Sequence, residues 1–145
     1  MTPQDFKEFY VRELDNLHKE ISAYTDESRL WILAGEIKNS PGNLCLHLIG
    51  NVNHFIGALI GNTGYVRKRD DEFAMKDVPK EKLLSDITAA KAMVEKVMSR
   101  IDASELQKEF PVEIMGKHST EYMLVFFLAH FNYHLGQINY SRRLI

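Results

Sequence analysis

Residues 129–138 read AHFNYHLGQI and carry two histidines, His130 and His134, four positions apart. Side chains at positions i and i+4 of a helix lie one above the other on the same face. Residues 122–141 contain no Asp, Glu, Lys or Arg, which is typical of a buried helix. Because buried polar groups are rarely left without a partner, the two imidazoles need hydrogen bonds, a metal ion or an opening to solvent.

Helical patterns extend from this stretch to the rest of the chain. Ser119 caps the helix that contains it, and this helix is expected to run nearly to the C-terminus. Three of the four prolines lie where a further helix would begin, a position that proline tolerates well. These helices are expected at residues 3–21, 41–60 and 79–101, with connections at 25–39, 61–78 and 102–118, the first of which contains one short helical turn.

No run of strand periodicity matches these four helices in length, so the fold is expected to be all-α. Four helices bury their apolar faces most simply as a four-helix bundle. The expected architecture is one domain, residues 1–145, that forms such a bundle with long connections between the helices. The helices at 41–60 and 122–141 are uncharged, so both are expected to be inner helices.

The composition excludes several classes of protein. A formal net charge of -2 provides no basic surface for nucleic acid. The charge-free stretches, residues 39–66 and 122–141, contain too many amides and imidazoles for a membrane span. Cys45 is the only cysteine, so it cannot form an intramolecular disulfide, and residues 1–9 are charged and amphipathic rather than secretory. We therefore expect a cytoplasmic protein that binds neither nucleic acid nor membrane.

A third histidine would complete a metal site. Two histidines at i and i+4 can chelate a first-row divalent ion from one helix face, and a third ligand must come from another element. His47 lies on the other uncharged helix and is the natural candidate. Three neutral imidazoles leave coordination positions for water or substrate, as in catalytic sites. The opposing interpretation is that His130 and His134, which lack the Glu of a zincin motif, are ordinary polar residues, and the residues alone leave both interpretations open.

Other residues give weaker signals. Neither uncharged helix offers an Asp or Glu as general base, so a base would come from a connection such as residues 67–72. Arg67 and Arg69 could bind an anionic cosubstrate or form a solvated charge cluster. Cys45 is expected to be a buried hydrophobe rather than a nucleophile. His54 is either a group that supports the site or the exposed end of its helix.

The motif His-x-x-x-His-x-Gly-Gln-Ile at residues 130–138, together with His47 in the segment NLCLHL, resembles the DinB/YfiT-like superfamily. The resemblance covers nearly the whole chain. It implies an up-down-down-up bundle, a divalent metal ion such as nickel or zinc on His47, His130 and His134, and frequent homodimers. Some members look like thiol-dependent enzymes that transfer bacillithiol to electrophiles or use mycothiol in an isomerisation.

Two functions of different classes follow as hypotheses. The first is a metal-dependent enzyme, a low-molecular-weight-thiol S-transferase in stress response or detoxification, with a small-molecule substrate and no assigned catalytic residue. The second is a dimeric helical binding protein without catalysis, whose histidines are structural or vestigial. Residues 64–70, GYVRKRD, match no thiol-binding motif, which leaves the cosubstrate open. A third hypothesis, metal-assisted hydrolysis, needs a water-positioning base that the sequence does not show.

Overall fold

The first long helix, α1 (Pro3–Ser22), begins where the sequence places its cap. In the computed structural model, which describes residues 1–145, the Thr2 side chain accepts a hydrogen bond from the Asp5 backbone N–H at 3.1 Å, and the Asp5 carboxylate accepts one from the Thr2 N–H at 2.8 Å. This capping box satisfies N–H groups that the start of a helix otherwise leaves free. The buried apolar residues of α1 repeat at helical spacing and are Phe6, Tyr10, Leu14, Leu17 and Ile21.

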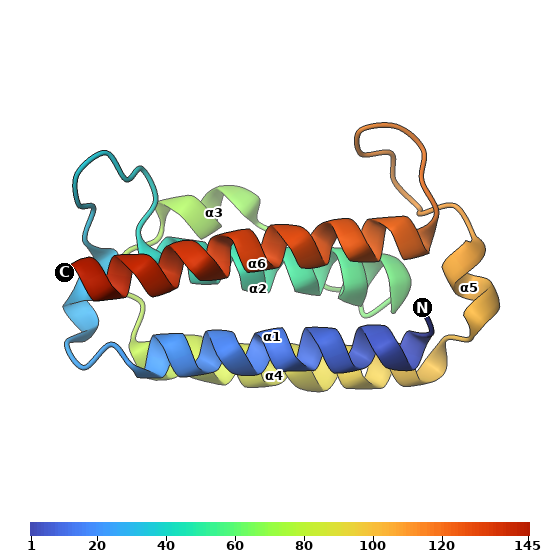
Figure 1. Ribbon diagram of the computed structural model, residues 1–145, viewed down its shortest axis with the longest axis horizontal. Helices are drawn as coiled ribbons and strands as arrows, with labels where there is room; N and C mark the ends of the chain where they lie inside the picture. Colours follow the sequence, from blue (N-terminus) through green and yellow to red (C-terminus); the bar gives the residue numbers. More distant parts are fainter.

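Four long helical segments lie side by side along the longest axis of the molecule (Figure 1). The other three are α2 (Pro41–Val52) with its continuation η2 (Asn53–Ile60), α4 (Lys80–Arg100) and α6 (Thr120–Leu144). Helix α1 packs on α4 and α6, and α2 packs on the same two helices. Helices α1 and α6 run in one direction, whereas α2 and α4 run in the other (Figure 1). The expectation of an all-α fold is confirmed, with 70% of the chain in helices and no strand.

Three short helices lie in the connections: η1 (Glu27–Trp31), α3 (Arg69–Ala74) and α5 (Ala103–Gln107). The sequence predicts the turn at η1, but it does not predict α3 or α5. Both are shorter than two helical turns, which is too short to show a hydrophobic period. Helix α5 is defined by its cap instead, because the Asp102 side chain accepts from the backbone N–H groups of Ser104 and Glu105 at 2.9 and 3.3 Å.

The helix expected at residues 41–60 is continuous, but its hydrogen bonding changes from α to π at Asn53. At the end of this segment the Gly61 N–H donates to the Ile56 carbonyl, five residues earlier, at 2.9 Å. Residue spacing does not distinguish this wider turn from an α-helix. By length and composition Pro41–Ile60 is also the one helix that could cross a membrane, and 61% of its most apolar window is buried inside the protein, which fits a core helix.

Helix α6 is less buried than the sequence suggests. One face is held by α1 and the segment after it, since the Tyr10 hydroxyl donates to the Leu124 carbonyl at 2.6 Å and the Tyr24 hydroxyl donates to the Ile138 carbonyl at 3.1 Å. The exposed side of α6 carries the large side chains Tyr122, Val125, Tyr133, Tyr140 and Leu144. The prediction that both uncharged helices are inner ones is therefore wrong for α6. Tyrosine carries no charge, but its hydroxyl tolerates water.

Candidate metal centre

Two capped helices bring the three candidate histidines together. The Ser40 hydroxyl accepts from the Asn43 N–H at 3.2 Å and fixes the start of α2, which carries His47. Ser119 fixes the start of α6, which carries His130 and His134, in the same way. One nitrogen from each of the three imidazoles lies within 4.8 Å of one from each of the others. The structure thus places all three sequence-predicted residues in one cluster that could hold a metal ion.

The spacing within the cluster suits ligation of one ion. Nε2 of His47 lies 3.2 Å from Nε2 of His130. Two nitrogens bound to the same tetrahedral zinc ion at about 2.0–2.1 Å are themselves about 3.3–3.4 Å apart. The ring of His134 completes the group, with its centroid 5.3 Å from that of His47 and 4.6 Å from that of His130. Little movement of the side chains is needed for all three to reach a shared ion.

The surroundings of His130 and His134 favour the uncharged form of these two imidazoles. Burial, together with the neighbouring His134 and His47, lowers the pKa of His130 to about 4. Burial also lowers the pKa of His134, although the hydrogen bond to Gln137 opposes this effect. Metal ligation requires neutral imidazole, so at neutral pH these two rings need not lose a proton before they bind an ion.

One atom in the cluster has no partner within the protein. Nδ1 of His130 is the only buried side-chain nitrogen or oxygen of the chain without a hydrogen bond. Such atoms are rare in folded proteins and call for an explanation. Ligation through Nδ1 would satisfy this atom, whereas ligation through Nε2, the atom that faces His47, would leave it unpaired. The set of three nitrogen donors also suits zinc, nickel and related first-row ions, so the residues present fit a divalent metal.

Gln137 sets the orientation of His134. Its amide Oε1 lies 2.6 Å from Nδ1 of His134. An amide oxygen only accepts, so Nδ1 carries the proton, and the lone pair of the ring lies on Nε2. Metal-binding histidines commonly donate their other N–H to an oxygen in this way. The hydrogen bond therefore supports Nε2 as the ligand atom of His134.

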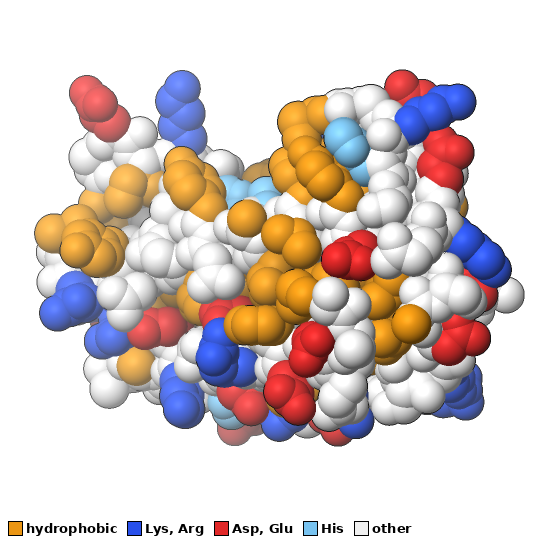
Figure 2. Space-filling view, turned by 45° about the vertical axis from the view of Figure 1, so that its right-hand side comes forward, with side chains coloured by type: hydrophobic (Ala, Val, Ile, Leu, Met, Phe, Trp, Pro, Cys, Tyr) orange, Lys and Arg blue, Asp and Glu red, His pale blue; other side chains and the backbone are white.

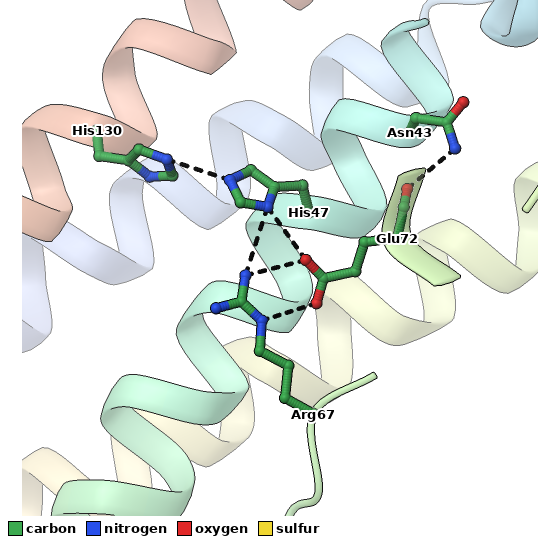
Figure 3. A network of polar contacts seen from close by, with 5 residues as sticks. All are labelled: Asn43, His47, Arg67, Glu72 and His130. Atoms are coloured by element: carbon green, nitrogen blue, oxygen red, sulfur yellow. Dashed lines mark hydrogen bonds and ion pairs between the residues drawn. The ribbon is translucent and has the colours of Figure 1, made fainter. Parts of the chain in front are cut away.

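The connection at residues 61–78 contributes the feature that sequence reasoning missed. Helix α3 places Glu72 against the site, with Oε1 3.1 Å from Nδ1 of His47 (Figure 3). The guanidinium of Arg67 binds both carboxylate oxygens at 2.9 Å. Glu72 is only 6% exposed and Arg67 is paired with it, so the interpretation of Arg67 as part of a solvated charge cluster is wrong. The only sequence signal was the lack of an acid in either uncharged helix, which pointed to residues 67–72.

The other candidates lie around the cluster rather than in it. Cys45 is fully buried, and burial raises the pKa of its thiol, so its assignment as a core residue is confirmed. Arg69 is exposed and lies 5.2 Å above the ring of Phe73, which itself packs against His47. His54 is half-buried and packs edge-on against the ring that follows it in the chain.

A cavity of about 440 Å³ opens beside His134 between α6 and the residues that precede and begin α2. None of its lining side chains carries a formal charge; they are Ile37, Asn39, Pro41, Leu44, Tyr133, His134, Gln137, Tyr140, Ser141 and Leu144. In Figure 2 the upper edge of the molecule is hollowed between two raised parts, and histidine atoms lie at the base of the hollow. His134, at the edge of the cluster, is therefore accessible to a small molecule.

Comparison with known families places the chain in the DinB/YfiT-like group of families, which confirms the resemblance at that level. Within this group it belongs to the family described as "Protein of unknown function (DUF1572)", whose model matches residues 4–145. A search of curated proteins gave no match.

Proposed function

We propose that this protein is a divalent-metal-dependent enzyme that acts on a small molecule. The observation that supports this most directly is the convergence of His47, His130 and His134 within 4.8 Å, beside an uncharged cavity. The directions and contacts of the four long segments are consistent with a single-domain, DinB-like four-helix bundle. Sites built from side chains on facing helices are common in such bundles.

The donor set favours catalysis over a purely structural metal site. Three neutral nitrogens leave coordination positions for water or substrate, whereas structural zinc sites use four protein ligands. When bound, a nickel or zinc ion would act as a Lewis acid and lower the pKa of a water molecule or thiol next to it. His47, His130 and His134 would hold the ion, and Gln137 would keep His134 in the ligating tautomer.

The state of Glu72 discriminates between two kinds of reaction. Hydrolysis needs a group that takes a proton from water. Both oxygens of Glu72 are engaged by Arg67, and one also contacts His47, so this carboxylate is not a free base. A thiol is far more acidic than water and needs less help to lose its proton. We therefore favour a low-molecular-weight thiol as cosubstrate, in an S-transfer reaction of stress response or detoxification in the cytoplasm.

A second candidate function is a dimeric helical binding protein without catalysis. The exposed side of α6 supports it, because Tyr122, Val125, Tyr133 and Tyr140 present an uncharged, largely aromatic surface of the kind that marks protein interfaces. A homodimer through α6 is also compatible with the enzyme. The two functions therefore differ in metal content and turnover rather than in oligomeric state.

Metal content tests the proposal. Protein purified without a histidine tag should contain about one divalent ion per chain by mass spectrometry, before or after soaking with nickel, zinc or manganese. His47→Ala and His134→Ala should lose the ion, and His18→Ala, a histidine on the remote helix α1, should retain it. Activity with thiols and electrophiles should then follow metal content. If the protein contains no stoichiometric metal under any of these conditions, the binding protein becomes the better proposal.

A further inference from the structure

We propose that Glu72 and Arg67 are positioning residues, which fix His47 in the tautomer that presents Nε2 to the metal. The inference rests on the proposed function in one respect, since it takes His47 as a metal ligand. It concerns two residues outside the three-histidine cluster, one of which lies on a short helix that the sequence does not predict.

The contact between His47 and Glu72 decides the tautomer. Oε1 of Glu72 lies 3.1 Å from Nδ1 of His47. An ionised carboxylate only accepts hydrogen bonds, and a lone pair on Nδ1 would repel it. The Nδ1 atom must therefore carry the proton and donate a hydrogen bond to Glu72. The lone pair of the neutral ring then lies on Nε2, which faces His130 (Figure 3).

Arg67 orients the Glu72 carboxylate and compensates its buried charge. Its Nε donates to Oε2 and its Nη2 donates to Oε1, both at 2.9 Å, in the fork geometry that holds a carboxylate in one plane. Nη2 also lies 3.4 Å from Nδ1 of His47, so it is a competing partner. A donation from Arg67 to Nδ1 would put the ring proton on Nε2 and block ligation. The shorter contact to Glu72 favours the ligating tautomer.

The burial of these charges indicates a dedicated arrangement. The side chains of His47, Glu72 and Arg67 are 7%, 6% and 11% exposed. Removing a carboxylate and a guanidinium from water is costly, and a buried ion pair is often no more stable than apolar residues of similar volume. Stability alone is therefore a weak reason for the pair. Control of the tautomer of a ligand is a reason that its geometry supports.

Two features of α2 make room for Glu72 and hold its helix. A Cβ atom at Gly50 would overlap the Glu72 carboxylate, so glycine permits the close approach. The Asn43 side-chain amide donates to the carbonyls of Glu72 and Met75 at 2.9 and 2.8 Å, which anchors the end of α3 (Figure 3). Helix α2 thus carries both the ligand and the means to position its partner.

The arrangement also changes the role of Arg67. Because Arg67 is paired with Glu72 through two hydrogen bonds and its side chain is only 11% exposed, this guanidinium is poorly placed to bind an anionic cosubstrate. Of the two arginines that the sequence nominates for that role, only Arg69 is exposed. Arg67 instead helps to position His47, by holding the Glu72 carboxylate in place.

Two readouts test the proposal: the tautomer of His47, from long-range ¹H–¹⁵N NMR correlations of the metal-free protein, and the nickel affinity, from calorimetric titration. The double variant Arg67→Met/Glu72→Leu removes both buried charges together, so neither charge is left without its partner and the variant should fold. We expect His47 to carry its proton on Nδ1 in the wild type and to shift towards Nε2–H in the variant. Nickel affinity should fall by about 10- to 100-fold.

Gly50→Ala provides an independent test, because it displaces Glu72 without changing any polar group at the site. It should also weaken nickel binding. Gly136→Ala is its matched control, since a Cβ there meets nothing within 4 Å, and it should bind nickel like the wild type. The control for the ion pair is Glu20→Ala, which breaks the remote Glu20–Arg142 contact of 2.9 Å and should leave both readouts unchanged.

The outcomes separate this inference from the proposed function. An unchanged tautomer and unchanged nickel affinity in a folded Arg67→Met/Glu72→Leu variant would overturn the positioning role and leave the metal site standing. A wild-type protein that binds no nickel would overturn the metal site. In that case the NMR comparison still decides whether Glu72 sets the tautomer of His47.

Discussion

Gln137 lies about one helical turn after His134 on α6, and its Oε1 is 2.6 Å from Nδ1 of His134. Loss of this acceptor should free the imidazole to change tautomer and rotate. We expect Gln137→Ala to lower the affinity for nickel by about 10-fold. Gln137 is exposed, so the helical circular dichroism signal should not change. Calorimetric titration measures the effect.

Asn132→Ala is the control for this variant, because Asn132 is an exposed amide on α6 that bonds only to the carbonyl of Leu128, at 3.2 Å. It should bind nickel normally. Equal affinities for the two variants would argue against a role for Gln137 at the site.

Binding of nickel should stabilise the folded protein, because the unfolded chain does not hold the three histidines together. At a free concentration of about 100 times the dissociation constant, the gain is about 2.7 kcal/mol. For a chain of this size the melting temperature should rise by about 6–10 °C. Differential scanning calorimetry measures the shift, and a chelator should reverse it. His47→Ala should show no shift, and a shift of the same size in that variant would place the ion elsewhere.

Stability should fall at alkaline pH, in part through Tyr24. Burial raises the pKa of this tyrosine to about 12, and its hydroxyl donates to the Ile138 carbonyl at 3.1 Å. The unfolded chain ionises near the ordinary pKa of about 10. The contribution of Tyr24 is therefore complete below pH 10 and is lost as the pH rises from about 10 to 12.

Tyr24→Phe should accordingly be less stable at neutral pH by about 1 kcal/mol, the usual cost of one hydrogen bond. It should lose less stability than the wild type between pH 9 and pH 11. Urea unfolding at several pH values measures both effects. Tyr10 is also buried and its pKa is also raised, so the variant should keep part of the alkaline loss. Parallel pH curves for the two proteins would contradict the assignment.

Gly42 packs against the only tryptophan. A Cβ at this position would lie 2.7 Å from the ring of Trp31. Alanine gains about 1 kcal/mol of helix propensity over glycine, but moving a rigid, packed ring costs about 1–3 kcal/mol. We expect Gly42→Ala to destabilise the protein and to shift the tryptophan fluorescence. Gly136→Ala is the control, because a Cβ at that position meets open space, and it should be neutral or stabilising. If Gly42→Ala is stabilised instead, the ring of Trp31 moves freely and the prediction is wrong.

The four long helices could be predicted because their signals are local. Thr2, Ser40 and Ser119 cap their helices as expected, and the spacing of His130 and His134 is itself a helical feature. The cluster with His47 could be predicted from two charge-free helices that had to meet. Each of these inferences needs only neighbouring residues and one assumption about packing.

The support of His47 could not be predicted in this way. Residues 67–72 read RKRDDE, and because all six side chains are charged the sequence indicates a surface segment. Glu72 is buried only because Gly50, on a different helix, leaves room for it and Arg67 neutralises it. The exposure of one side of α6 could not be predicted either, because nothing in the sequence indicates which face of an uncharged helix meets solvent.

His47 and His130 are separated by 83 positions in the chain. During synthesis, α2 leaves the ribosome long before α6 exists, and a single histidine holds a divalent ion only weakly. The chelating group appears only after α6 has been made and has docked on α2. Loading with metal would therefore report that folding is complete, and truncated or misfolded chains would not compete for the ion.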